Sequence, residues 1–417
     1  MNKDIQFKKN FIWNILGTGI NAFNSLFFMI AVTRINGIEN AGVFTIGYAT
    51  ACIIYVIGIY AGRIYQVTEP DKSITNKEYI INRIITVALM NILVLAFCLI
   101  RKYDAYKTII FLLLTFYKSL EAFSEVIYGI LQKNEKLEIV GKSLFIKSIV
   151  SICAFIVVDI ISKNVILSII SAIIIWIIII ILFDLKKSKT HIDYSKKVNW
   201  KNVLKIFRFG FTTFAIAFLG LYILNAPKYS IDTYLGNDIQ TIFGIIVMPA
   251  TVIGLVAQFL IHPFLNQILK VYEERNLKQL KKIIMKLILA IACIGIISSI
   301  LAYFIGTQLL GLIYGIDLSM YKIGLLIIII SSTLYTIGII YSSVLTTVRE
   351  TFSQFIIYVI ISIFALIISD ILTKTWNIDG AIWAYLAIMS LQFLIYTVYT
   401  NLKLKVIFTR EIEKWKR

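Results

Sequence analysis

The chain has few residues of the kinds that build disulfide frameworks, metal centres and hydrolytic sites. Its 417 residues include four cysteines and two histidines. The cysteines lie in apolar stretches, and none belongs to a CxxC pair or a Cys/His cluster, so we expect neither a disulfide framework nor a metal site. His191 and His262 are far apart in the sequence, which argues against a zinc hydrolase. No GxxxxGKS or GxxxxGKT loop is present, so ATP hydrolysis is excluded within this chain, and we expect no cofactor and no catalytic residue.

Charged residues are also scarce, at 15% of the chain, whereas 59% is hydrophobic and the mean hydropathy is +0.85. The uncharged run "VILSIISAIIIWIIIIILF" at 165–183 is long enough to cross a bilayer, since a helix needs roughly 20 apolar residues to span about 30 Å of hydrocarbon. A soluble domain of this size has no core that would bury so many such runs. The sequence therefore predicts an all-α polytopic membrane protein. The first apolar run, 11–32, is too long for a signal-peptide core of about 7–15 residues, so we expect it to stay in the protein.

The apolar runs predict about twelve transmembrane helices, arranged as two lobes of six. They are expected at about 11–33, 41–62, 80–100, 108–130, 141–160, 164–184, 207–230, 240–262, 283–304, 322–345, 353–372 and 380–401. The longest connection joins the sixth and seventh spans. The expected domains are an N-terminal lobe at 1–184, a basic cytoplasmic linker at 185–206, a C-terminal lobe at 207–402 and a basic cytoplasmic tail at 403–417.

The distribution of lysine and arginine predicts the orientation of these spans. With the N-terminus in the cytoplasm, 30 of the 41 basic residues fall on the inner side, 8 on the outer side and 3 within spans. Basic residues gather on the cytoplasmic side of membrane proteins. We therefore expect both termini in the cytoplasm. The same bias explains the net charge of +18, so no nucleic-acid partner is expected.

A weak internal repeat relates the two halves of the chain. With an offset of 199 residues, the segment 35–65 aligns with 234–264, and Gly37 matches Gly236. Halves of six spans each share one orientation in the membrane, so the two would be related by an axis along the membrane normal. Transporters are often built from such repeats, with the substrate site at the repeat interface.

The predicted fourth span carries charged residues in the stretch "FYKSLEAFSEVIYGILQ" at 116–132. Lys118, Glu121 and Glu125 are spaced i, i+3 and i+7, so they share one face of a helix. A charge at the bilayer centre costs about 2.5–3.5 kcal/mol even on the lenient insertion scale, so these residues need a reason to be there. Three interpretations stay open, namely a structural ion pair, contact with a substrate, and proton coupling through Glu121 or Glu125. Arg63 is one cation that would balance the carboxylates, and Arg83 and Lys147 are two others.

Two stretches carry a resemblance to a known family. The segment "LEAFSEVIYGILQKNEKLEIVGKSLFIKS" at 120–148 resembles the fourth-to-fifth-span region of Wzx-like polysaccharide-biosynthesis flippases. The segment at 224–265, which begins "LNAPKYSIDTYLGNDIQ", is similar to their seventh-to-eighth-span region, and 10–49 fits their first two spans. These flippases belong to the multidrug/oligosaccharidyl-lipid/polysaccharide exporter superfamily. The resemblance covers most of the chain.

The resemblance implies a MATE-like fold, with two six-helix lobes in a V shape around a central hydrophilic cavity. It also implies transport of a polyprenyl-diphosphate-linked oligosaccharide from the inner to the outer leaflet of the bacterial plasma membrane, for capsule, O-antigen or exopolysaccharide synthesis, by alternating access. The implied partners are this lipid-linked oligosaccharide, the lipid bilayer, and a polymerase with other polysaccharide-assembly proteins.

Candidate cavity residues are cationic or hydrogen-bonding groups within or near spans, because cations would hold the diphosphate and amides and hydroxyls would meet the sugars. They are Lys118, Glu121, Asn14, Asn21, Arg34, Arg63, Asn225, Lys228, Tyr229 and His262. Simpler roles stay open for several of them. The asparagines of the first span would also serve as interhelical hydrogen-bond donors, and Lys228 would also pair with Asp232. Arg63 and His262 would also snorkel to the interface.

Other functions remain as alternatives. A lipid II flippase and a MATE-like cation-coupled drug antiporter share the expected architecture. A membrane-embedded polysaccharide polymerase is disfavoured, because no outer loop exceeds about a dozen residues. The driving force stays open between a proton gradient, a sodium gradient and consumption of the product downstream.

Overall fold

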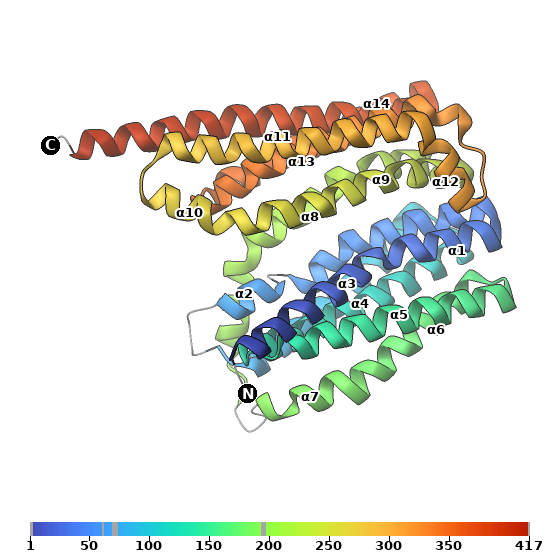
Figure 1. Cartoon of the computed structure of the whole chain (residues 1–417). Helices are drawn as coiled ribbons and strands as arrows, with labels where there is room; N and C mark the ends of the chain where they lie inside the picture. The colour runs from blue at the N-terminus through green and yellow to red at the C-terminus, as the bar shows by residue number, and fades with distance from the viewer. Residues whose placement is uncertain (1–2, 61, 69–73, 193–196, 416–417) are drawn as a thin grey trace. The chain divides into compact units, whose positions relative to one another are not determined.

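The computed structural model describes residues 3–60, 62–68, 74–192 and 197–415, with the side chains of 3–5, 7, 64, 259, 262 and 410–415 left out of the description. The described chain is almost entirely helical, and Figure 1 shows the helices as long, roughly aligned rods within each part. Every backbone N–H and C=O must be paired internally in hydrocarbon, which is why a chain of this hydropathy folds into helices.

The first helix, α1 (Lys3–Ile59), supplies two spans. It consists of two helices that meet at a kink at Gly37, whose backbone has φ 85° and ψ 172°. Glycine adopts a positive φ without the steric cost that other residues incur. In the internal repeat Gly37 aligns with Gly236, which lies between the first two long helices of the second half.

Five further helices complete the first half. They are α2 (Gly62–Thr68), α3 (Asn76–Arg101), α4 (Ala105–Lys133), α5 (Leu137–Ser162) and α6 (Val165–Ile179). The helix of α6 continues through the π-helical turn η1 (Ile180–Leu185) and the short α7 (Lys186–Ser188) into the 3-10 turn η2 (Lys189–His191). The predicted sixth span is therefore present, but its inner end is wound differently from a plain α-helix.

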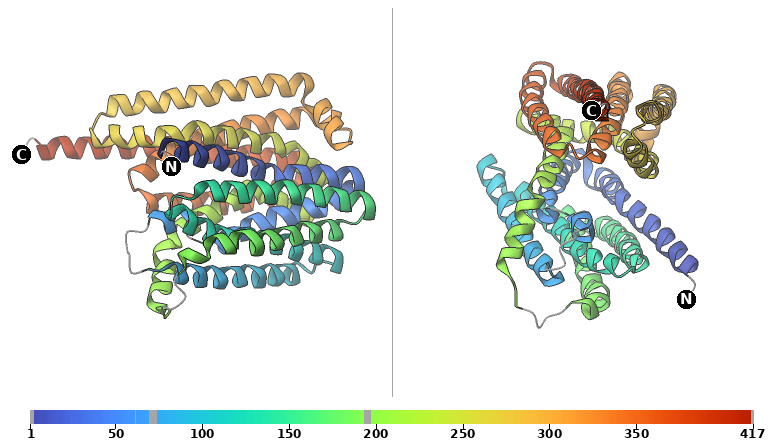
Figure 2. Two further views of the ribbon diagram at one scale, coloured as in Figure 1. Left: turned by 60° about the horizontal axis from the view of Figure 1, so that its bottom comes forward. Right: turned by 90° about the vertical axis from the view of Figure 1, so that its left-hand side faces the viewer.

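The second half repeats the use of a long broken helix. Its elements are α8 (Trp200–Tyr234), α9 (Asn237–Ile261), η3 (His262–Phe264), α10 (Leu265–Glu273), α11 (Leu277–Leu301), η4 (Ala302–Gly306), α12 (Thr307–Tyr314), η5 (Ser319–Tyr321), α13 (Lys322–Thr347) and α14 (Thr351–Trp415). Asn377, with φ 53° and ψ −134°, breaks α14 into two spans. The end of α14 extends past the ends of α10 and α11 (Figures 1 and 2).

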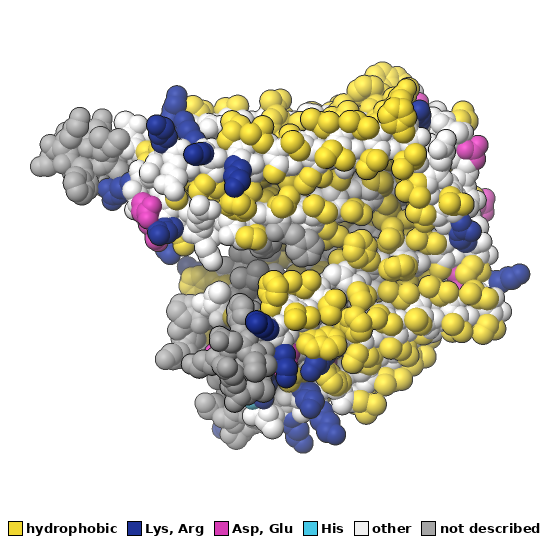
Figure 3. Space-filling model, viewed as in Figure 1, with side chains coloured by type: hydrophobic (Ala, Val, Ile, Leu, Met, Phe, Trp, Pro, Cys, Tyr) yellow, Lys and Arg dark blue, Asp and Glu magenta, His cyan; other side chains and the backbone are white. Residues whose placement is uncertain are grey.

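Nine helices of the described chain are long and apolar enough to cross a membrane. Two of them, of 52 and 59 residues, contain the breaks at Gly37 and Asn377 and so supply two spans each. The 29-residue α4 is long enough as well, but its five charged residues are spread along the whole helix. The count agrees with the predicted twelve spans, and the predicted all-α fold class is confirmed. Hydrophobic side chains cover much of the helical surface, as expected of a multi-pass membrane protein (Figure 3).

The chain divides into two compact units, Met1–Leu221 and Tyr222–Arg417. The boundary lies within α8, and the basic segment 185–206 belongs to the first unit. Inside that unit α1 crosses α5 with the backbones in direct contact at Gly17 and Gly141. A Cβ atom added at Gly17 would collide with the carbonyl oxygen of Gly141. Small residues allow such close helix–helix approach in membranes, where little hydrophobic drive holds helices together.

Candidate functional site

The polar centre of the first unit is built around α4. The helix begins at Asp104, whose carboxylate accepts a hydrogen bond from the backbone N–H of Lys107 at 2.9 Å. An acidic cap of this kind satisfies one of the N–H groups that a helix start leaves open. Beyond the cap, α4 carries two polar faces. One bears Lys118, Glu121 and Glu125, and the other bears Ser124 and Tyr128.

Lys118 and Glu121 form a direct ion pair. The Lys118 Nζ atom lies 2.6 Å from Glu121 Oε2, and the two side chains are 12% and 11% exposed. The second carboxylate oxygen, Oε1, accepts a hydrogen bond from the Asn21 amide of α1 at 3.1 Å. Residues of both α1 and α4 therefore hold the pair, and a small part of both side chains remains exposed. It is a neutral unit when both partners are ionised.

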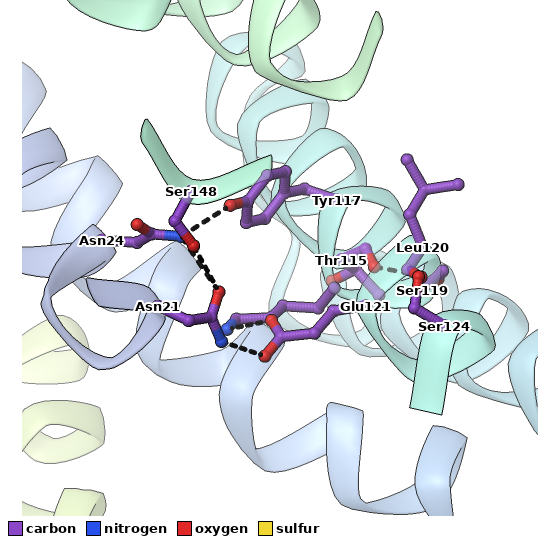
Figure 4. A network of polar contacts seen from close by, with 10 residues as sticks. Asn21, Asn24, Thr115, Tyr117, Ser119, Leu120, Glu121, Ser124 and Ser148 are labelled. Carbon is purple, nitrogen blue, oxygen red and sulfur yellow. Dashed lines mark hydrogen bonds and ion pairs between the residues drawn. The ribbon is translucent and has the colours of Figure 1, made fainter. Parts of the chain in front are cut away.

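A hydrogen-bond network places Asn21 (Figure 4). Its amide oxygen accepts from Asn24 at 3.1 Å and from the Ser148 hydroxyl of α5 at 3.2 Å. Asn24 also donates to the Tyr117 hydroxyl at 3.3 Å. Since these bonds satisfy the Asn21 oxygen, its NH₂ group is directed at Glu121. The network thus fixes the orientation of the carboxylate.

Two tyrosines of α1 flank the ammonium group of Lys118. Its Nζ atom lies 5.1 Å from the centre of the Tyr48 ring and 5.6 Å from that of Tyr55. Both rings are half-buried, and their spacing of seven residues places them on one face of the helix. A cation within about 6 Å of an aromatic face is attracted by the ring quadrupole. The cation is thereby stabilised on sides that the carboxylate does not cover.

Glu125 has a cation of its own. Its Oε2 atom lies 3.7 Å from Arg63 Nε of α2, and the two side chains are 21% and 20% exposed. Lys118, Glu121 and Glu125 form the charged stripe of α4. With Arg63 included, the charges of these four groups sum to zero when all are ionised. Arg83, another of the cations considered in the sequence, donates from its guanidinium to the carbonyl oxygen of Gly58.

The other polar face of α4 meets an ion pair that the sequence interpretation did not identify. Lys147 of α5 pairs with Asp184, and both side chains are 0% exposed. Lys147 Nζ also donates to Ser124 Oγ at 2.7 Å and to the Tyr128 hydroxyl at 3.1 Å. Ser143 donates to the free oxygen of Asp184 at 2.6 Å. A buried pair tolerates its desolvation only when extra hydrogen bonds satisfy both partners, as they do here.

Asp184 reaches Lys147 from the π turn η1. The wider π turn changes the direction in which the following residues point, and such turns recur at functional positions. One signal for this pair was present in the sequence, since an acidic residue directly follows the uncharged run 165–183 and a lysine lies within the neighbouring span. The structure joins three helices at this sealed pair, whereas the Lys118–Glu121 pair keeps an open edge.

The remaining predicted site residues lie elsewhere. Asn14 is half-buried one helical turn before Thr18, whose hydroxyl donates to the Asn14 carbonyl at 2.6 Å. Arg34 is exposed, close to the break in α1. Asn225, Lys228 and Tyr229 are half-buried on α8 in the second unit. The side chain of His262 lies outside the described part of the structure.

The structure thus brings Asn21, Lys118 and Glu121 into one cluster, with Arg63 and Glu125 as a second pair on the same stripe. This arrangement offers a cation that is held by one carboxylate and two aromatic rings. It offers hydrogen-bond donors and acceptors and a carboxylate able to carry a proton. Such a cluster suits the binding of a charged, polar headgroup.

The fold is shared with transporters of the MOP superfamily. An inward-facing multidrug-resistance MATE transporter of that superfamily aligns with a TM-score of 0.64 and 12% identity, over 95% of this chain and 99% of the other. The Vibrio cholerae MATE transporter VcmN in its bent form aligns with a TM-score of 0.62 and 11% identity, over 97% and 98%. A MOP-superfamily transporter from Pyrococcus furiosus, described as having a binding pocket of reversed polarity, aligns with a TM-score of 0.60 and 12% identity, over 96% and 95%.

One curated relative links the chain to a biosynthetic process. The chain is 26% identical over 381 residues to the capsular polysaccharide biosynthesis protein CapF of Staphylococcus aureus, covering 89% of this chain and 94% of that one. No protein-family model matches. The fold and this relative confirm the predicted resemblance to the superfamily and to its polysaccharide branch. The solved structures show the fold, and the match to CapF shows a similarity in sequence to a protein of capsular polysaccharide biosynthesis.

Proposed function

We propose that this chain flips a polyprenyl-diphosphate-linked oligosaccharide from the inner to the outer leaflet of a bacterial plasma membrane, for assembly of a capsule-type polysaccharide. The observation that carries the proposal is the partly exposed Lys118–Glu121 pair within the membrane-spanning helix α4. The similarity to CapF supports the polysaccharide part of the proposal. Both termini would lie in the cytoplasm, as the basic residues predict.

The substrate poses a solvation problem that such a site addresses. A diphosphate and a glycan cannot cross hydrocarbon unaided, because each unsatisfied polar group costs several kcal/mol there. Lys118 would receive the diphosphate as a charge-assisted hydrogen-bond donor, while Asn21, Tyr48 and Tyr55 would meet sugar hydroxyls and sugar faces. The polyprenyl tail would stay in lipid throughout.

Further contacts are proposed on the remaining candidates. Lys228, with Asn225 and Tyr229 beside it on α8, would offer a second cation and hydrogen-bonding groups. Arg63 and His262 would act where the headgroup enters, and Arg34 where it leaves. Asn14 would hydrogen-bond sugar from the first helix. The flipped product would pass to a polymerase and other polysaccharide-assembly proteins.

The two alternatives differ in the charge and the headgroup that they require. A cation-coupled drug antiporter needs a site that attracts cations, and an ammonium group that is already paired with the nearest carboxylate disfavours a second cation. A lipid II flippase also carries a lipid-linked diphosphate, so only the headgroup distinguishes it from the proposed function. The test below therefore includes both.

The test is a flipping assay in proteoliposomes with polyprenyl-diphosphate-linked glycans, lipid II and a cationic dye as separate cargoes. Flipping of the glycan-linked lipid by the wild-type chain, with its loss in Lys118→Met, supports the proposal. The matched control is Lys142→Met, because Lys142 is 38% exposed on α5 and pairs only loosely with Glu138, at 3.9 Å. Export of the dye without flipping of the lipid, or preference for lipid II, would overturn it.

A further inference from the structure

The charge balance of the α4 stripe determines how a bound anion and a proton are linked. We propose that the diphosphate replaces Glu121 as the partner of Lys118 and that Glu121 takes up one proton in the same step. Anionic cargo and proton are then bound together. This inference rests on the proposed function and adds to it the ion that is coupled and the sign of the coupling.

The argument begins with the neutrality of the resting pair. Lys118 Nζ is in direct contact with Glu121 Oε2 at 2.6 Å, so one positive charge and one negative charge cancel. A diphosphate that reaches this ammonium brings two negative charges beside the Glu121 carboxylate. Like charges at such short range are strongly unfavourable in a poorly solvated site. Protonation of Glu121 removes one of them and leaves a carboxylic acid that can donate a hydrogen bond to the anion.

No unpaired cation is described around Glu121 that would neutralise the negative charge of the bound diphosphate. From α4 it contacts Lys118 and lies near Tyr117 and, one turn further, Glu125. From α1 it accepts from the neutral Asn21 amide and lies near the uncharged Tyr48 and Tyr55. These groups supply no second cation to the pair. The other cations of this region have partners of their own. Arg63 of α2 pairs with Glu125, Lys147 of α5 pairs with Asp184, and Arg83 of α3 donates to the Gly58 carbonyl.

The contacts of the two carboxylates assign the proton to Glu121 rather than to Glu125. Glu125 lies against Arg63, and its side chain is about twice as exposed as that of Glu121. Binding at Lys118 does not itself remove Arg63 from Glu125, so Glu125 has its cation when the diphosphate lies at Lys118. Glu121 is the carboxylate whose partner the cargo takes away. The sequence interpretation had left both residues open as proton carriers.

The sign follows from linkage between the two ligands. If binding of the anion takes up one proton, its association constant rises about tenfold for each unit by which the pH falls. The cargo itself adds no pH dependence near neutrality. Each of its phosphates has one ester bond and one anhydride bond, so it lacks the second ionisation that a phosphate monoester shows near pH 6. A cation antiporter would show the opposite slope, with tighter cargo binding at higher pH.

The experiment measures binding of a polyprenyl diphosphate carrying one N-acetylglucosamine to the full chain in nanodiscs, at pH values from about 5.5 to about 8. We expect the wild type to gain about tenfold in affinity per unit of falling pH. Glu121→Gln, which mimics the protonated acid, should bind tightly with no slope. Glu125→Gln, which tests the other carboxylate of the stripe, should keep the wild-type slope. Proton uptake on binding to the wild type, followed with a pH indicator in weak buffer, needs no variant.

The outcomes separate the inference from the function on which it rests. Binding without a pH slope in the wild type, or a slope that persists in Glu121→Gln, overturns the inference and leaves the proposed cargo intact. Loss of the pH slope in Glu125→Gln but not in Glu121→Gln would assign the proton to Glu125, and this result also overturns the inference. Absence of binding at every pH overturns the proposed function, and the inference falls with it.

Discussion

The interiors of the two units differ in charge. In the first unit the buried polar side chains include seven charged ones, which are Glu78, Arg83, Lys107, Glu121, Lys147, Asp159 and Asp184. In the described part of the second unit the buried polar side chains are all serine, threonine or glutamine. Both units are helical and are built from chain of similar hydropathy. The comparison therefore places the fully buried charges in the described part of the first unit, whereas the described charged side chains of the second unit, such as Lys228 and Asp370, are only half-buried or exposed.

Charged groups inside the first unit also differ among themselves. Lys147 and Asp184 are sealed and fully hydrogen-bonded, and Asp159 accepts from both Asn36 and Ser168. Lys118 and Glu121 are paired but retain exposure. A sealed pair fixes helices in place, whereas a pair with an open edge is available to a cargo. Under the proposed function, exposure rather than the presence of charge distinguishes the pair that would meet cargo from the pairs that would hold helices together.

The largest effect is expected when the sealed pair is broken. Lys147→Met leaves Asp184 as a buried carboxylate without its cation, and we expect a loss of about 3–5 kcal/mol in the free energy of unfolding. SDS unfolding titrations of the purified protein in one detergent would measure it. The double variant Lys147→Met/Asp184→Leu should recover much of the loss, because no lone charge then remains. If Lys147→Met were as stable as the wild type, the buried ion pair would not contribute to the stability of the first unit, and the proposed difference between the units would be wrong.

A smaller effect is expected at the helix crossing. In Gly17→Ala the new Cβ would collide with the Gly141 backbone, and we expect a loss of about 1–3 kcal/mol from the forced separation of α1 and α5. Gly19→Ala, where no atom lies within 4 Å of the added carbon, is the matched control and should be neutral or slightly stabilising. Equal losses in both variants, read by the same titration, would rule out the close crossing.

The smallest effect is expected in the second unit. Gln354 accepts from Ser342 at 2.7 Å and donates to Thr346 at 3.0 Å. Gln354→Leu removes two neutral hydrogen bonds, so we expect a loss of about 1–2 kcal/mol, well below that of Lys147→Met. The comparison is sharpened if the same variant leaves lipid flipping unchanged in proteoliposomes. A loss as large as that of Lys147→Met would show that neutral hydrogen bonding is as critical there as charge is in the first unit.

The span count could be predicted from the sequence because hydropathy alone decides which segments cross a bilayer. The charged stripe of α4 could be predicted as well, since the spacing of Lys118, Glu121 and Glu125 fixes their common face. The residues that contact these charged side chains could not be predicted. Asp184 meets Lys147 through a π turn, and Tyr48 and Tyr55 flank Lys118 through the packing of α1 on α4. Such contacts depend on how helices are rotated and placed, which periodicity does not specify.

The division of the chain teaches a related lesson. Composition places the boundary between halves in the basic segment 185–206, where charges and short loops gather. The compact units divide within α8, between Leu221 and Tyr222. A long helix can begin with its contacts in one unit and end with them in the other, and no change in composition marks that point.

Binding of the lipid-linked diphosphate to Lys118 variants tests the central claim most directly. Equilibrium binding of the N-acetylglucosamine-bearing polyprenyl diphosphate in nanodiscs should weaken at least tenfold in Lys118→Met, partly recover in Lys118→Arg and stay at the wild-type value in Lys142→Met. Retention of wild-type affinity by a folded Lys118→Met protein would contradict the account, because the cation that is proposed to bind the diphosphate would then hold no cargo.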